Sequence, residues 1–138
     1  MIFEILYGFM ATAGFAILFN IPKNMIIISA FSGAIGWSGY LIMMHIYPSV
    51  ILSTFIASVF IGIMGEFFAR HYKNPSTIFV IPGILPLVPG AYSYKTMFAI
   101  IQGNNKQALN LGLQTIGIAI AIAVGLILVI SFARIKQR

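Results

Sequence analysis

The fold of this chain depends most on one short segment, Ile81-Pro82-Gly83-Ile84-Leu85-Pro86-Leu87-Val88-Pro89-Gly90. It places three prolines and two glycines within the nine residues 82–90, inside an apolar run that extends over residues 78–101. Proline has no backbone N–H and clashes with the preceding turn, so we predict that no regular helix passes through this segment. At membrane depth, irregular backbone persists only where protein buries it or where it lines a polar cavity. The sequence therefore predicts a broken helix beside such a cavity.

The composition of the chain is that of a membrane protein. Of its 138 residues, 60% are hydrophobic and only 7% are charged, whereas soluble domains carry about 25% charged residues. We expect an all-α integral membrane protein that forms a single membrane domain over residues 1–138. The net charge of +6 does not indicate nucleic-acid binding, because the basic residues are scattered at the ends of apolar segments. With no cysteine and two histidines in separate loops, no metal site is expected.

Five apolar segments are long enough to cross a bilayer as helices, which takes about 20 residues each. They cover residues 2–19, 25–44, 50–69, 78–101 and 108–133. Five crossings would put six basic residues on one side and only Lys106 on the other, whereas four crossings would divide them four against three. Because basic residues gather on the cytoplasmic side, we predict five transmembrane helices with the N-terminus outside, the C-terminus inside and the broken fourth segment crossing. The six are Lys23, Arg70, Lys73, Arg134, Lys136 and Arg138.

Three of the five segments carry a stripe of small or polar residues at helical spacing. Such stripes allow close packing of helices in lipid, and the fifth segment adds hydrogen-bonding groups at Asn110 and Gln114. Packing alone and a polar lining for a pathway are both compatible with this pattern. The stripes are Ser29, Gly33, Gly36 and Tyr40; Ser58, Gly62, Gly65, Glu66 and Ala69; and Asn110, Gln114, Gly117, Ala121 and Gly125.

The sharpest candidate site surrounds the break. A new half-helix is expected after Gly90, and its free N–H groups and positive dipole end suit a carboxylate. Lys95 follows five residues later as a charge in an apolar run. It either binds a substrate carboxylate, or its long side chain extends so that the ammonium group reaches the membrane interface. A break that is only structural, held by neighbouring helices, is the alternative. The candidate substrate-binding residues are Pro82, Gly83, Pro86, Pro89, Gly90, Tyr92, Ser93, Tyr94 and Lys95.

A second candidate group is Glu66 with Arg70. The two are four residues apart, so they can pair along one helix face, or Glu66 can act as a protonatable coupling group. Asn110 and Gln114 are further candidates for coupling or pairing. No nucleophile and base pair, metal set or cofactor motif is present in the sequence, so we do not expect an enzyme.

Four motifs, in order along the chain, resemble the threonine/serine exporter family: Asn20-Ile21-Pro22, Ser32-Gly33-Ala34-Ile35-Gly36, Gly62-Ile63-Met64-Gly65-Glu66 and the segment 81–90. The chain is similar to the small, C-terminal-type half of these proteins, which in many bacteria is a separate chain. The resemblance implies a multi-pass protein of the bacterial cytoplasmic (inner) membrane and a larger partner subunit of the same family. It also implies export of threonine and serine or, in some split systems, of a dicarboxylate such as succinate.

Two functions follow from these observations. In the first, the chain is a subunit of a secondary transporter that binds the carboxylate of its substrate near the broken segment, as transporters with discontinuous helices do. Five spans here, and five of opposite orientation in the partner, would then form an inverted repeat. In the second, the chain is an accessory or assembly subunit without a substrate site of its own.

Overall fold

The computed structural model describes residues 1–135, and all regular elements in that part of the chain are helices. The predicted all-α class is therefore confirmed. Two basic residues used above for the orientation, Lys136 and Arg138, lie outside the described residues. The elements are α1 (Ile2–Leu18), α2 (Lys23–Ile46), α3 (Val50–Tyr72), α4 (Thr77–Ile84), the 3-10 turn η1 (Leu85–Leu87), α5 (Gly90–Ile101) and α6 (Asn105–Ile135).

Helix length supports three or four membrane spans. α2, α3 and α6 are each long and apolar enough to cross a bilayer. The pair formed by α4–η1 and α5 is bent by 42° and counts as a fourth span if the two pieces form one crossing. α1 is apolar but has only 17 residues, which is at the lower limit for a transmembrane helix. Five crossings, and their orientation, therefore remain predictions.

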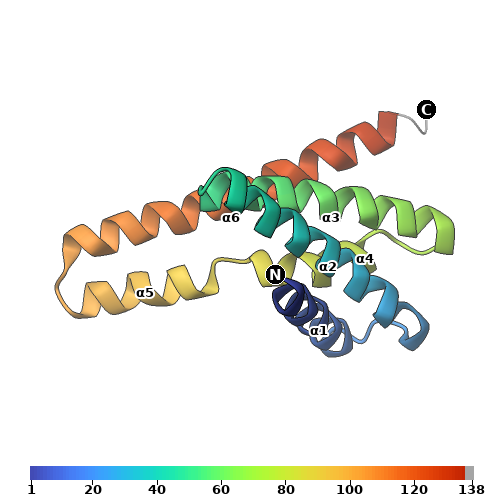
Figure 1. The fold of residues 1–138 in the computed structure, drawn as a ribbon, viewed down its shortest axis with the longest axis horizontal. Helices are drawn as coiled ribbons and strands as arrows, with labels where there is room; N and C mark the ends of the chain where they lie inside the picture. Colours follow the sequence, from blue (N-terminus) through green and yellow to red (C-terminus); the bar gives the residue numbers. More distant parts are fainter. Residues whose placement is uncertain (136–138) are drawn as a thin grey trace.

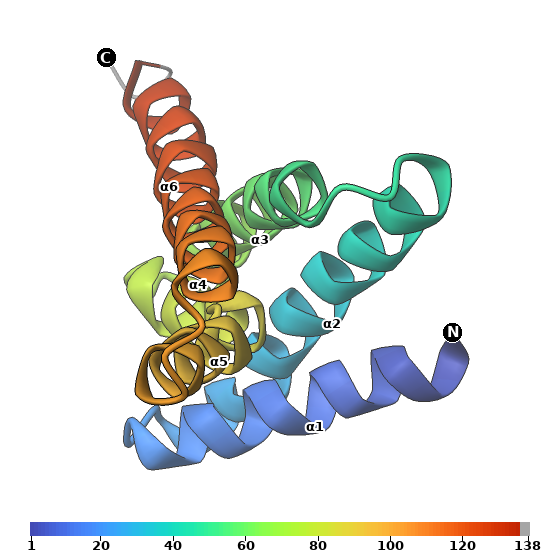
Figure 2. The ribbon, with the colours of Figure 1, turned by 90° about the vertical axis from the view of Figure 1, so that its left-hand side faces the viewer.

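α3 packs against three helices, whereas α1 packs mainly on α2 and α5 on α6 (Figures 1 and 2). α3 lies between α2 and α6, and α4 packs along a third side. Ile61 is fully buried where α2, α3 and α4 meet, against Gly36 and Gly83. α6 runs parallel to α3: Ile51 contacts Gly117 at one end, and Arg70 reaches Ala133 at the other.

Glycines of the predicted stripes allow the helices to approach closely. A side chain at Gly33 would overlap Thr12 of α1, and one at Gly125 would overlap Ser58 of α3. These positions lie on the stripes of the second and fifth apolar segments. The packing role predicted for Gly33 and Gly125 is therefore confirmed, and it follows from the general preference for small residues where helices meet in membranes.

The helix is not interrupted where the prolines begin, contrary to expectation. Pro82 lies inside α4, and the chain leaves helical geometry only at Val88 and Pro89, before α5 begins. Pro82 has no N–H for the carbonyl of Ile78, four residues earlier. The buried hydroxyl of Ser29, on α2, donates to that carbonyl at 2.7 Å. α4 passes through Pro82 because a neighbouring helix supplies the missing hydrogen bond.

α5 and the first residues of α6 form an antiparallel hairpin that projects from the bundle (Figure 1). We call α5 together with residues 105–116 of α6 the arm. Its turn is specified by Gly103, which has a φ of 73°, and by Asn104, whose side chain accepts from the N–H of Gln107 at 3.2 Å. Because α3 begins beside Gly117, the arm extends beyond it by about 18 Å, at 1.5 Å per residue.

Candidate functional site

The break encloses a cavity of about 220 Å³. Its wall is formed by η1 and the start of α5 on one side and by α2, α3 and α6 on the other. Trp37, Tyr40, Thr54 and Tyr92 are its lining residues with polar side-chain groups; the Thr54 hydroxyl already donates to the carbonyl of Val50 at 2.8 Å. The Trp37 ring stacks on Tyr40, with ring centroids 5.1 Å apart. The lining residues are Trp37, Tyr40, Val50, Thr54, Pro86, Leu87, Val88, Pro89, Ala91, Tyr92 and Ile118.

The structure brings only part of the predicted site to this cavity. Pro86, Pro89 and Tyr92 line it. The other candidates lie elsewhere: Pro82 and Gly83 are buried within α4, Gly90, Ser93, Tyr94 and Lys95 are exposed, and the Ser93 hydroxyl donates to the Pro89 carbonyl at 2.9 Å. Lys95 therefore does not face the break in this structure.

Of the cavity residues that were not predicted, three contribute polar or aromatic side chains, namely Trp37, Tyr40 and Thr54. Tyr40 belongs to the small-residue stripe of the second apolar segment, which was the one available signal. Trp37 and Thr54 are typical of packing positions in any membrane helix. Their proximity to the prolines depends on how α2 and α3 cross α4, and no sequence pattern gives that crossing.

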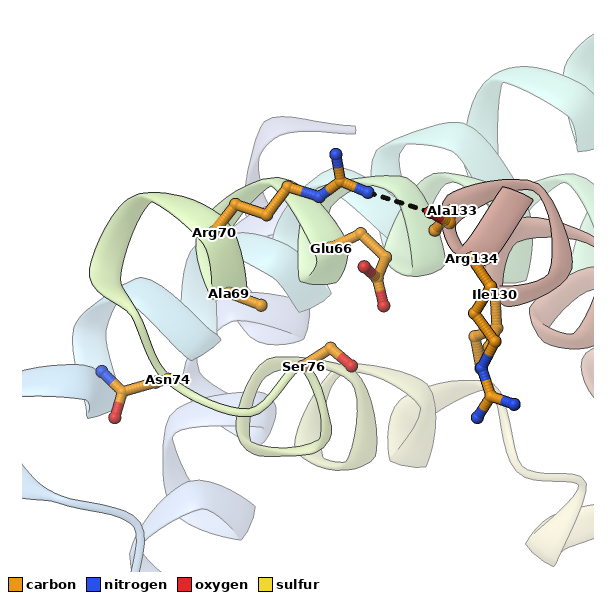
Figure 3. A pocket seen from close by; sticks show the side chains of 8 residues that line it. All are labelled: Glu66, Ala69, Arg70, Asn74, Ser76, Ile130, Ala133 and Arg134. Atoms are coloured by element: carbon orange, nitrogen blue, oxygen red, sulfur yellow. Dashed lines mark hydrogen bonds between the residues drawn. The ribbon is translucent and has the colours of Figure 1, made fainter. Parts of the chain in front are cut away.

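A second, more polar pocket of about 340 Å³ lies where α3, α4 and α6 meet (Figure 3). The Glu66 carboxylate points into it from α3, Ser76 contributes a hydroxyl at the start of α4, and the Arg134 guanidinium enters from α6. A pocket of this volume is within the range that binds small molecules. The lining residues are Glu66, Ala69, Arg70, Asn74, Ser76, Ile130, Ala133 and Arg134.

The pairing considered for Glu66 and Arg70 is not formed in the structure. The Arg70 guanidinium instead donates to the Ala133 carbonyl at 3.3 Å (Figure 3). The last carbonyls of a helix have no partner within the helix, so the α6 terminus competes for this arginine. Over residues 1–135, the one ion pair joins the N-terminal amine to Glu4, at 3.0 Å. The carboxylate of Glu66 therefore remains available to a ligand.

The remaining candidates lie away from both pockets. Asn110 and Gln114 are exposed on the arm, beyond the part of α6 that packs on α3. Among the described residues, no group of three or more histidine, aspartate or glutamate side chains is arranged to hold a metal ion.

Comparisons with known proteins give three findings. The model of a family described as "Threonine/Serine exporter, ThrE" matches residues 4–132. An uncharacterized protein of Haemophilus influenzae (strain ATCC 51907 / DSM 11121 / KW20 / Rd) is 28% identical over 102 residues, which are 74% of this chain and 34% of that protein. The chain thus corresponds to about a third of that relative's length. No solved structure matches the chain.

Proposed function

The chain belongs to the threonine/serine exporter family, and from this premise we propose that it is one subunit of a two-chain exporter of small amino acids. Membership of this family favours a role in transport and gives no support to an enzymatic function. A larger subunit of the same family would complete the pathway. The limited share of the Haemophilus relative covered by this chain agrees with such a division.

The single observation that carries the proposal is the charge arrangement of the Glu66 pocket. It presents one carboxylate, that of Glu66, and two guanidinium groups, those of Arg70 and Arg134, to the same volume, and no ion pair within 4.0 Å joins Glu66 to either arginine. A zwitterionic amino acid needs an anion for its ammonium group and a cation for its carboxylate. A dicarboxylate would meet repulsion at Glu66, so the pocket favours serine or threonine over succinate.

α4 connects this pocket with the cavity at the break. Ser76 precedes α4 and lines the Glu66 pocket, whereas Pro86 follows α4 and lines the break cavity. We place the route of the substrate along this helix, with Tyr40 and Tyr92 as hydrogen-bonding groups at its far end. Discontinuous helices line substrate sites in many secondary transporters. Energy for export against a gradient would come from proton coupling, with Glu66 as the protonatable group.

Efflux from cells that lack endogenous exporters tests the proposal. The chain, the larger family subunit from the same organism, or both would be expressed, and loss of preloaded threonine, serine and succinate followed. We expect efflux of the amino acids only when both chains are present. Glu66→Gln and Arg134→Gln should each lower it at least tenfold at unchanged membrane levels, whereas Lys73→Gln, outside the pocket, should not.

The second candidate function is an assembly subunit without a substrate site. It is favoured by the exposure of Lys95, Asn110 and Gln114, which leaves three predicted polar groups on a free surface. Amino-acid efflux from the larger subunit alone would establish this function and refute the first. Unchanged efflux in both pocket variants would do the same.

A further inference from the structure

The arm has little contact with the rest of the protein. α5 packs on α6 and makes no other extensive helix contact, and the part of α6 that it meets precedes the contact between α6 and α3. Large apolar side chains consequently remain exposed on both helices, by 48% to 78% of their surface. They are Tyr94, Met97, Phe98, Ile100, Ile101, Leu109, Leu113 and Ile116.

The two sides of the arm differ in chemistry. Thr96 faces Gly112 across the hairpin, and on one side of this contact lies an apolar groove of about 350 Å³ that Ile100, Leu109 and Leu113 help to line. The residue that precedes Thr96 by one is turned about 100° from it, away from this groove. Lys95 occupies this position on α5.

Lys95 has no countercharge within the described chain. The structure contains two carboxylate side chains over residues 1–135, Glu4 and Glu66. Glu4 pairs with the N-terminal amine, and Glu66 lies in the pocket between α3, α4 and α6, far along α3 from the arm. No carboxylate comes within 4.0 Å of the Lys95 ammonium group.

Neither water nor lipid alone suits this surface. Water would hydrate Lys95 but would leave eight large apolar side chains exposed, which marks an interaction site on a protein surface. Lipid would cover the apolar groups, but it leaves the ammonium group without a partner unless the lysine stem reaches the interface, and charges within membranes pair with one another. A helix that is apolar overall and carries one carboxylate satisfies both requirements.

We propose that the arm is the docking surface for a transmembrane helix of the partner subunit, and that this helix carries an aspartate or glutamate opposite Lys95. The inference rests on the two-chain exporter proposed above, and it assigns Lys95 to subunit association instead of substrate binding.

To test this assignment, a tagged form of this chain is co-expressed with the larger family subunit and purified in detergent. The amount of the larger subunit that is recovered with the tagged chain is then measured. Lys95→Glu should lower recovery at least tenfold, because it places two carboxylates together in the contact. Lys73→Glu makes the same charge change at the C-terminal end of α3 and should leave recovery unchanged. Replacing the matching acid of the larger subunit by lysine should restore binding to Lys95→Glu.

A second measurement uses the absence of cysteine from the chain. A Phe98→Cys variant places the thiol three residues from Lys95 on the same face of α5, and it should be cross-linked to single cysteines in one helix of the larger subunit. Wild-type recovery of Lys95→Glu would overturn the inference, and so would cross-linking of Phe98→Cys mainly to a second copy of this chain. Efflux measured in the same cells separates the two proposals. If the two chains form a stable complex but no efflux occurs, only the transport function is refuted. If the Lys95→Glu complex stays intact and efflux occurs, only the docking surface is refuted.

Discussion

Ser29→Ala should destabilise the protein by about 1.5 kcal/mol. The Ser29 side chain is fully buried and donates to the Ile78 carbonyl at 2.7 Å. Hydrogen bonds between membrane helices contribute about 0.6 kcal/mol on average and up to about 1.7 kcal/mol. We expect the upper part of that range, because Pro82 has no N–H with which to replace the lost donor. A change of this size shifts the folding equilibrium roughly tenfold.

Unfolding by sodium dodecyl sulfate in bicelles measures the effect, with the single tryptophan of the chain, Trp37, as fluorescent probe. The decisive comparison is a double-mutant cycle with Pro82→Ala. An alanine at position 82 restores the helix donor to the Ile78 carbonyl, so Ser29→Ala should then cost less than about 0.5 kcal/mol. An equal cost of Ser29→Ala in both backgrounds would refute the view that this hydroxyl replaces the hydrogen bond that proline removes.

Three further predictions use the same unfolding measurement. Gly33→Ala should cost about 1–3 kcal/mol because its methyl group overlaps Thr12, whereas Gly14→Ala, with no neighbour within 4 Å, should not destabilise. Gly103→Ala should cost roughly 1–2 kcal/mol, since a φ of 73° is unfavourable for a residue with a Cβ atom; no loss would mean that the turn of the arm adopts another conformation. The effects of Arg70→Gln and Glu66→Gln should add within about 0.5 kcal/mol, and strong coupling would show that the two side chains form an ion pair after all.

The sequence predicted most of the helices because their limits depend on local chemistry. Apolar runs and the turn residues between them located α2, α3 and both parts of the broken segment to within a few residues. α6 begins three residues earlier than expected, because Asn104 caps it at a point that polarity alone assigns to a loop. α1 matches its predicted range, but its length alone does not establish a crossing.

The site was harder to predict because it depends on contacts between distant segments. The continuation of α4 through Pro82 requires a hydroxyl that lies 49 positions away in sequence. The orientation of Lys95 depends on which face of α5 meets α6, and the apolar run that contains it has no strong periodicity to indicate that face. Glu66 was recognised as a candidate, whereas Arg134, which shares its pocket, was interpreted only as part of a basic flank.

The parallel arrangement of α3 and α6 also bears on how the protein is made. Two neighbouring helices that point the same way cannot be joined by a short loop, so the chain must first return along the bundle, and α4, η1 and α5 provide this return. During synthesis, α1 to α4 can assemble while α6 is still within the ribosome. Until α6 arrives, the face of α3 that bears Ser58 and Gly62 has no protein neighbour. Packing around α3 is therefore completed only when α6, the longest helix described, arrives, and an arrest before that point would leave one side of α3 open to the insertion machinery.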